Sequence, residues 1–170
     1  FPARKLVIIG VTGTDGKTSS IHYLTQILEE AGKKVGMLTT VAIAVHGMRQ
    51  LNTTKMTTLN PFELHRRLRE MVAKGCHYAV IETTSHALDQ NRVYGLRYDV
   101  VALTNITHEH LDYHKTMGEY RKAKEQLFAH NPRVAVINTD DPAAPYFLNY
   151  PAGTKLTYAI LDSLRPKEAL

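Results

Sequence analysis

An apolar run, a glycine-bearing loop and an amphipathic segment follow one another near the start of the chain, and this succession constrains the fold most. Residues 6–11 (LVIIGV) are continuously apolar and rich in β-branched side chains, as in a strand that is buried on both faces. The succession predicts a strand, a loop and a helix, which is the local context of a phosphate-binding loop. Apolar residues recur at helical spacing between the loop and Gly32, and the predicted buried face of that helix is Ile21, Leu24, Ile27, Leu28 and Ala31.

The loop itself, residues 12–19 (TGTDGKTS), has the composition that phosphate binding requires. Glycines let the backbone curl so that successive N–H groups face one anion, and the helix N-terminus adds partial positive charge. We expect Lys17 to reach the β- and γ-phosphates of a nucleotide and the Thr18 hydroxyl to ligate Mg²⁺. Val11 stands where the general pattern has its first glycine, so a plain glycine turn remains the alternative. The predicted nucleotide contacts are Gly13, Thr14, Asp15, Gly16, Lys17, Thr18 and Ser19.

Strand and helix patterns alternate along the rest of the chain. Residues 41–51 predict a hairpin, and helices are predicted over residues 61–74, with Asn60 as the N-cap, and over residues 117–130. This alternation predicts an α/β fold of the P-loop kind, with a mostly parallel sheet and helices on both faces, in one domain over residues 1–170. The further predicted strands are residues 35–40, 78–81, 100–103, 134–137 and 156–160.

Composition narrows the function classes. No apolar run approaches the ~20 residues of a membrane helix, so we expect no membrane partner. Cys76 is the only cysteine, which excludes an internal disulfide and fits a reducing, cytoplasmic environment. The net charge of +5 favours anions, but the basic residues are scattered rather than gathered in a stripe. A phosphorylated small molecule explains this charge, and a nucleic acid partner is not expected.

Several segments resemble one known family. Residues 12–18 are similar to the nucleotide loop of the Mur ligases and their folate-polyglutamate relatives, which often carry Asn at the position of Asp15. Leu59 and Thr83 depart from the family pattern, which often has Pro and Val there. Five further segments, in the family order, resemble the branch of UDP-N-acetylmuramoyl-tripeptide synthetases: residues 56–58, 82–93, 104–114, 123–124 and 138–141.

The resemblance implies a fold and an activity. Mur ligases have three domains and the central one binds ATP, so the chain would be a central domain without its UDP-binding and amino-acid-binding neighbours. The implied reaction joins lysine or diaminopimelate to the terminal glutamyl carboxylate of a UDP-muramoyl-dipeptide through an acyl phosphate, in peptidoglycan synthesis. The chain alone would then have little or no ligase activity. A folate-polyglutamate synthetase-like ligase and a non-catalytic nucleotide-binding module are the alternatives.

Two Mg²⁺ ions are expected at the site. Glu82 ends a buried strand, where an unpaired carboxylate is costly unless a cation, a helix end or an arginine offsets the cost. The resemblance implies that Lys124 is carbamylated and, with His110, holds the second ion, whereas the residue alone would pass for a surface lysine. Residues 108–114 (HEHLDYH) leave a transition-metal site as an alternative. The predicted metal ligands are Thr18, Glu82, His110 and Lys124, and the predicted catalytic residues are Lys17, Lys124 and His110.

Substrate contacts are also implied by the resemblance. Asn105 would touch substrate or a metal-bound water, and Asn138 and Asp141 resemble the adenine-side residues of the family. An ordinary turn or cap remains the competing interpretation for these polar side chains. The residues implied to contact the UDP-muramoyl-dipeptide are Thr57, Thr58, Thr84, Gln90 and Arg92.

Overall fold

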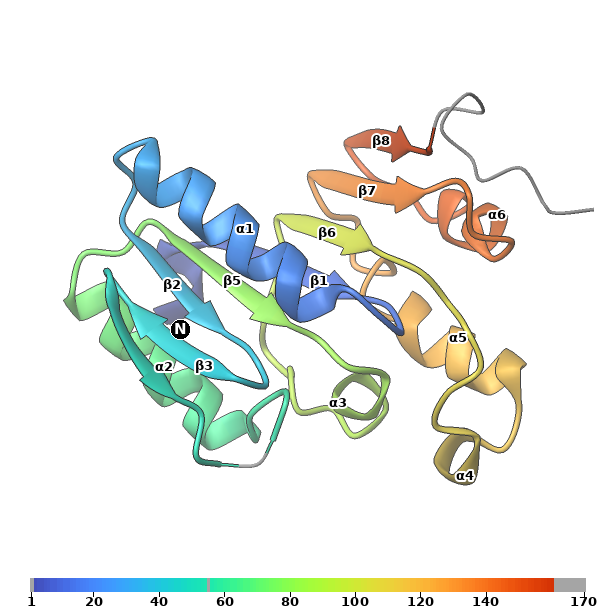
Figure 1. Ribbon diagram of the computed structural model, residues 1–170, viewed down its shortest axis with the longest axis horizontal. Coiled ribbons are helices and arrows are strands. Elements are labelled where there is room, and N and C mark those ends of the chain that lie inside the picture. The colour runs from blue at the N-terminus through green and yellow to red at the C-terminus, as the bar shows by residue number, and fades with distance from the viewer. Residues whose placement is uncertain (1, 55, 161–170) are drawn as a thin grey trace, which may run out of the picture.

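One eight-stranded sheet runs through the computed structural model, which describes residues 2–54 and 56–160 (Figure 1). Its strand order is β4-β3-β2-β5-β1-β6-β7-β8, and every neighbouring pair is parallel except β2 with β3 and β3 with β4. The predicted mostly parallel sheet and the predicted hairpin are therefore confirmed. The strands are β1 (Val7–Thr12), β2 (Val35–Leu38), β3 (Ala42–Val45), β4 (Met48–Leu51), β5 (Tyr78–Glu82), β6 (Val100–Leu103), β7 (Val134–Asn138) and β8 (Thr154–Tyr158).

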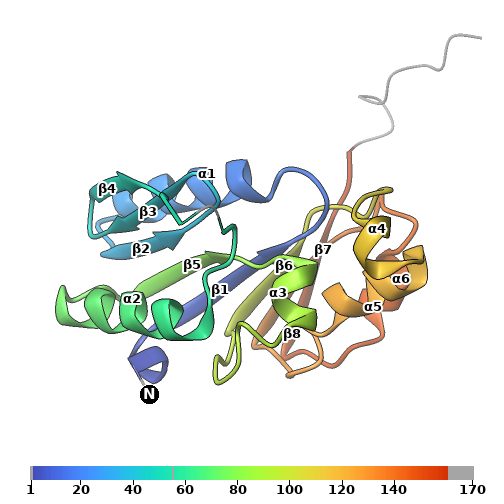
Figure 2. The same ribbon diagram turned by 90° about the horizontal axis from the view of Figure 1, so that it is seen from below.

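Helices cover both faces of this sheet, but unequally. α1 lies on one face, and α2, α3, α5 and α6 lie on the other (Figure 2). The connection through α1 runs from β1 to β2, toward the β4 edge of the sheet, whereas the connections after β5, β6 and β7 run toward the β8 edge. Because crossovers between parallel strands are right-handed, opposite directions place the helices on opposite faces. The helices are η1 (Pro2–Lys5), α1 (Lys17–Glu30), α2 (Pro61–Ala73), α3 (Ser85–Asp89), α4 (Leu111–His114), α5 (Met117–Glu125) and α6 (Ala144–Leu148).

Each face has its own apolar core. Under α1, the buried core includes Ile9, Val11 and Ile21. On the other face, a larger core joins α2 to α6 through such residues as Leu68 and Phe147. Strands β1, β2, β3 and β5 are apolar on both sides because both sides are buried, which explains their continuous apolar runs, whereas the edge strands β4 and β8 are exposed.

The centre of the sheet contains one close approach between a strand and a ring. A Cβ atom added to Gly10, in β1, would lie 2.6 Å from two ring carbons of Tyr98. Tyr98 is buried and its hydroxyl shares a hydrogen bond of 3.2 Å with the hydroxyl of Thr83. A glycine is therefore required in this strand because the ring occupies the space of a side chain.

The predicted buried face of α1 and some predicted element boundaries are wrong. Ile27 is 66% exposed, and Thr25 is buried in its place, because α1 is turned so that Thr25 faces the sheet. The predicted helix over residues 117–130 ends at Glu125, and turns with i to i+3 hydrogen bonds follow it. The last strand lies two residues earlier than predicted, at 154–158, and the short helices α3, α4 and α6 were not predicted. In the described part of the chain, no helix has the length and apolar character to cross a membrane.

Candidate active site

The loops that carry the predicted site residues meet at the carboxyl ends of the parallel strands. β1 lies between β5 and β6; the connection after β1 leads to β2 on one side, whereas the connection after β6 leads to β7 on the other side. Open α/β sheets bind ligands at such a switch point, because the loops there diverge and leave a crevice. The loops after β1, β5, β6 and β7 correspond to the segments singled out in the sequence.

The loop after β1 turns at two glycines with positive φ. Gly13 and Gly16 have φ of 148° and 78°, which glycine adopts without the clash of a Cβ. A Cβ on Gly13 would also meet the Thr104 hydroxyl at 1.8 Å. α1 begins at Lys17 with no side-chain cap, so its first N–H groups lack a side-chain acceptor. The backbone therefore suits an anion at this helix N-terminus.

The loop after β6 holds the phosphate loop from one side. The backbone N–H of Thr14 donates to the carbonyl of Asn105 at 2.8 Å, and that of Asp15 donates to Asn105 Oδ1 at 2.9 Å. The Thr104 hydroxyl donates to the Asp15 carbonyl at 2.7 Å. Thr107 N donates to Thr14 Oγ1 at 2.9 Å. Asn105 thus fixes the backbone of the phosphate loop, which supports its interpretation as a turn residue.

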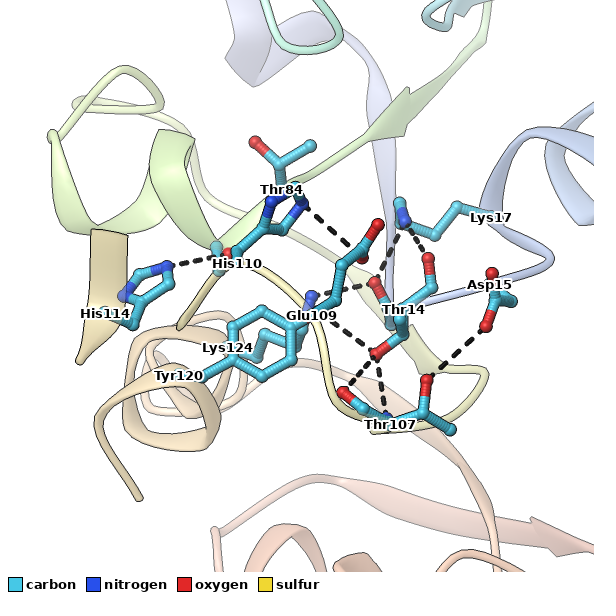
Figure 3. A network of polar contacts seen from close by, with 12 residues as sticks. Thr14, Asp15, Lys17, Thr84, Thr107, Glu109, His110, His114, Tyr120 and Lys124 are labelled. Carbon is cyan, nitrogen blue, oxygen red and sulfur yellow. Dashed lines mark hydrogen bonds and ion pairs between the residues drawn. The ribbon is translucent and has the colours of Figure 1, made fainter. Parts of the chain in front are cut away.

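Two lysines converge on one carbonyl of this loop. Lys17 Nζ donates to Gly13 O at 3.0 Å and to Thr14 O at 2.5 Å, and Lys124 Nζ donates to the same Gly13 O at 2.7 Å. Tyr120, one turn before Lys124 on α5, shares a hydrogen bond of 3.0 Å with the Thr14 hydroxyl. Figure 3 shows Lys17, Tyr120 and Lys124 gathered around Thr14.

Lys124 is not a surface lysine. Only 1% of the residue is exposed, and its ammonium lies 4.4 Å from the centroid of the Tyr120 ring. Burial, reinforced by the nearby charge of Lys17, lowers the pKa of Lys124 to about 7. The interpretation that the residue alone suggested is wrong, because α5 packs its Lys124 face under the phosphate loop.

Glu82 and Thr18 are brought together as predicted. Glu82 is 2% exposed, and the Thr18 hydroxyl lies 3.0 Å from both of its carboxylate oxygens. Thr40, after β2, adds its backbone N–H at 2.9 Å and its hydroxyl at 3.1 Å. No basic side chain of the described residues forms an ion pair with Glu82. A buried carboxylate that is balanced only by neutral donors suits a divalent cation.

His110 lies on the loop that crosses this region. Its φ of 57° is left-handed, and its Nε2 lies 3.4 Å from Glu109 Oε2. Its ring centroid is 4.7 Å from that of His86 and 6.2 Å from that of Tyr120. Residues 2–54 and 56–160 contain no group of three or more His, Cys, Asp or Glu side chains arranged for a metal. The transition-metal alternative therefore has no geometric support, whereas the magnesium set, with its hydroxyl and lysine, stays a prediction.

A second polar cluster follows β5. Arg92 Nε donates to Gln90 Oε1 at 2.8 Å, and Arg92 Nη1 donates to Thr58 O at 3.3 Å. Gln90 Nε2 donates to the Tyr113 hydroxyl at 3.1 Å. The Thr58 hydroxyl is buried and accepts from Thr84 N at 3.2 Å, so it braces the loop. Thr58, Thr84, Gln90 and Arg92 are thus neighbours, as four of the five residues implied to contact the dipeptide. Thr57 is half-buried and forms no hydrogen bond with these four in the described part of the chain.

The loop after β7 uses its polar side chains on the backbone. Asn138 Nδ2 donates to Thr104 O at 2.8 Å. Asp141 is buried and accepts from Ile106 N at 2.6 Å and from Ala143 N at 2.8 Å. These contacts support the interpretation as turn residues, and the adenine-side role stays a prediction.

Several residues of the site were missed by sequence reasoning. Tyr120 carried a usable signal, because it lies four residues before Lys124 and so shares its helix face. Thr40 ends a predicted strand, which places it beside Glu82 at the same sheet edge. Ser85 and His114 carried no such signal, since their contact joins segments 29 residues apart.

Comparisons with known proteins identify the family of this chain. The model of the Mur ligase middle domain family matches residues 11–167. The chain is 42% identical over 169 residues to the UDP-N-acetylmuramoyl-L-alanyl-D-glutamate–2,6-diaminopimelate ligase of Geobacillus thermodenitrificans, covering 95% of this chain and 34% of that protein. Against the protein of the same name from Aquifex aeolicus the identity is 40% over 165 residues, with 96% and 34% covered. The chain thus spans about a third of the length of these relatives.

Solved structures give the same result. A structure of UDP-N-acetylmuramoyl-L-alanyl-D-glutamate–2,6-diaminopimelate ligase superposes with a TM-score of 0.81 at 32% identity, covering 94% of this chain and 33% of that one. An FPGS–AMPPCP complex superposes with a TM-score of 0.67 at 18% identity, over 92% and 46% of the two chains, which shows a shared fold alone. The family match over most of the chain and the relatives at 40% identity or more establish that this chain belongs to the Mur ligase family, as a middle domain.

Proposed function

We propose that this chain is the ATP-binding central domain of a three-domain cytoplasmic ligase of peptidoglycan synthesis. The ligase would join an amino acid to the terminal carboxylate of UDP-N-acetylmuramoyl-L-alanyl-D-glutamate. The names of the relatives favour diaminopimelate over lysine as that amino acid. The observation that carries the proposal is the convergence of Lys17, Lys124 and the Thr18–Glu82 pair on one phosphate loop.

The first chemical step has to bring two anions together. Amide formation needs a better leaving group than hydroxide, and ATP provides one by phosphorylating the substrate carboxylate. Mg²⁺, when bound, would neutralise charge on the phosphates and the carboxylate. Thr18 and Glu82 would hold one ion, and His110 with carbamylated Lys124 would hold the second.

Lys17 has a definite role in this proposal. Its ammonium donates to the carbonyls of Gly13 and Thr14, so it lies at the phosphate loop. We expect it to exchange these neutral acceptors for the β- and γ-phosphates of ATP, because an ammonium is attracted more strongly to an anionic phosphate oxygen than to a neutral carbonyl oxygen. The fixed cation would then stabilise the charge that develops on the transferred phosphoryl group.

The environment of Lys124 suits carbamylation. The lone pair of the neutral Nζ amine attacks the carbon of CO₂, an N–C bond forms while one C=O π pair moves to oxygen, and one proton leaves the nitrogen, so the neutral amine becomes an anionic carbamate. This reaction requires the neutral amine, and burial with a pKa of about 7 leaves much of Lys124 neutral at neutral pH. The carbamate would lie beside the cation of Lys17, which would stabilise it. Density at Lys124 in crystals grown with bicarbonate and Mg-ATP would test the modification.

Lys17→Ala tests the nucleotide site. In the full-length protein we expect this variant to lose saturable Mg-ATP binding in calorimetry and to lose ligase turnover. The matched control is Lys33→Ala, which removes an exposed lysine from the turn after α1 and should leave both unchanged. Unaltered turnover of the Lys17 variant would defeat the assignment.

Arg92→Ala tests the second cluster. The planar guanidinium suits a carboxylate or a phosphate of the dipeptide substrate. We expect the KM for UDP-muramoyl-dipeptide to rise about tenfold or more, which corresponds to a charge-assisted hydrogen bond of roughly 1.5–3 kcal/mol, with the KM for ATP within about twofold. Arg97→Ala, an exposed arginine before β6, is the control. A KM equal to that of the control would exclude Arg92 from the substrate site.

The two other functions make different predictions. A folate-polyglutamate synthetase-like ligase shares this fold, so equilibrium binding of a folate against UDP-muramoyl-dipeptide to the full-length protein separates the two. A non-catalytic nucleotide-binding module would form no ADP with any candidate amino acid. The buried Lys124 and Glu82 favour the ligase, because a module that only binds nucleotide has no need of these costly buried groups.

A further inference from the structure

The turn that carries His110 has an unusual backbone at both ends. α4 is only four residues long, and it is bounded by His110 with φ of 57° and Lys115 with φ of 64°. Residues other than glycine rarely adopt such angles, and they persist only where the surroundings hold them in place. The structure must therefore contain an anchor that keeps this turn in its conformation.

His114 has the contacts of such an anchor. It is 6% exposed, and its Nε2 lies 3.0 Å from the hydroxyl of Ser85, the first residue of α3. Its ring centroid lies 5.3 Å from that of His86, 4.7 Å from that of Tyr113 and 5.4 Å from that of Tyr120. One side chain of the turn thus contacts both α3 and α5.

These contacts connect the groups of the proposed active site. Ser85 lies three residues after Glu82, His110 begins the same turn as His114, and Tyr120 bonds to Thr14 of the phosphate loop. The backbone N–H of His114 also donates to His110 O at 3.0 Å. A displacement of His114 would therefore move His110 relative to both the phosphate loop and the strand end of Glu82.

We propose that His114, through its hydrogen bond to Ser85, is a positioning residue that holds the His110 turn against the phosphate loop. The inference deepens the proposed ligase function and rests on it. His114 is 6% exposed and would act through the His110 turn rather than on a reacting atom. A purely structural histidine would stabilise the fold without affecting the chemical step, and this difference is measurable.

Three variants of the full-length protein test the proposal. His114→Phe keeps a ring but loses the hydrogen bond, Ser85→Ala removes the partner, and His114→Gln keeps a nitrogen near the position of Nε2. We expect the first two to lower kcat about tenfold, with the KM for ATP within about twofold, and the Mg²⁺ concentration at half-maximal rate to rise. His114→Gln should recover most of kcat. His77→Phe, an exposed histidine before β5, is the matched control.

The pair of contacts also predicts non-additivity. If the Ser85 hydroxyl and His114 act through one hydrogen bond, the double variant Ser85→Ala/His114→Phe should lose no more of kcat than either single variant, within about twofold. Losses that multiply would overturn the proposal. A variant with the kcat of wild type but a lower urea midpoint would also overturn the proposal, because a merely structural role predicts that result.

A readout without turnover separates this inference from the ligase assignment. In the same variants, hydrogen exchange of the backbone amides of residues 113–116 should be faster than in wild type, because the turn has lost its anchor. Unchanged exchange would overturn the inference even if the enzyme is a ligase. Absence of turnover in the wild-type protein would instead overturn the proposed function, while faster exchange in the variants would still support the anchor.

Discussion

At the scale of single residues, the site is defined by charged groups in places where charge is costly. Glu82 is buried among hydroxyl and amide donors, and Lys124 is buried beside a second lysine. Neither arrangement favours folding by itself, because burial penalises the charged form of each side chain. Such groups are expected at sites that act on charged ligands.

The buried Lys124 makes the stability of the protein depend on pH. Its pKa is lowered from 10.5 in the unfolded chain to about 7 in the folded chain. Between these values the unfolded state binds the proton and the folded state does not, so the free energy of unfolding rises with pH across this window. Below about pH 7 the full penalty of burying Lys124 applies.

Lys124→Met isolates this effect. We expect the free energy of unfolding of wild type, measured by urea denaturation in CO₂-free buffer, to rise relative to that of the variant between about pH 7 and pH 10. The rise should approach at most about 1.4 kcal/mol for each pH unit. Parallel pH profiles for the two proteins would contradict the lowered pKa.

At the scale of elements, the strands carry the core and the loops after them carry the chemistry. β1 is the clearest case, because Gly10 in its middle admits the ring of Tyr98 and Gly13 just beyond it admits the Thr104 hydroxyl. The two glycines serve different purposes, one for packing and one for the phosphate loop. Helix α5 combines both, since it packs against the core and carries Tyr120 and Lys124 under the loop.

A pair of glycine substitutions tests this account of the elements. Gly10→Ala places a Cβ 2.6 Å from the Tyr98 ring, so it should destabilise the fold by about 1–3 kcal/mol through overpacking. Gly118→Ala, in α5, meets nothing closer than 3.8 Å and should stabilise the fold by about 0.4–1 kcal/mol. Urea denaturation measures both, and shifts of the same sign would contradict the packing of β1.

At the scale of the whole molecule, the chain corresponds to one part of its longer relatives. It spans about a third of the length of the relatives that it matches. Under the proposed function, the amino acid would bind on a separate C-terminal domain. Activation of a carboxylate and its capture by an amine would therefore occur on different domains of the full-length protein.

The isolated 170-residue chain should consequently form no detectable amide. We expect a coupled ADP-release assay with UDP-muramoyl-dipeptide and diaminopimelate to report turnover for the full-length protein and background for the chain alone. Efficient amide synthesis by the isolated chain would contradict the proposal that carboxylate activation and amine capture occur on different domains.

The sequence by itself determined the class of the fold and the position of the candidate phosphate loop. Continuous apolar runs indicate buried strands. The conformation of the TGTDGKTS loop was also predictable, because the backbone angles of its glycines and the start of the helix after it depend on residues that are neighbours in the sequence. The N-cap Asn60 was also predictable, and its side chain accepts from Glu63 N. Local physics was sufficient for these features.

Only the tertiary structure decided what the distant residues do. The burial of Lys124 depends on how α5 packs under a loop 111 residues away, and the donors around Glu82 come from α1 and from the end of β2. The exposure of Ile27 depends on the rotation of α1 over the sheet, and the contact of His114 with Ser85 depends on the meeting of two short helices. Such features arise from packing between segments, and no pattern within one segment encodes them.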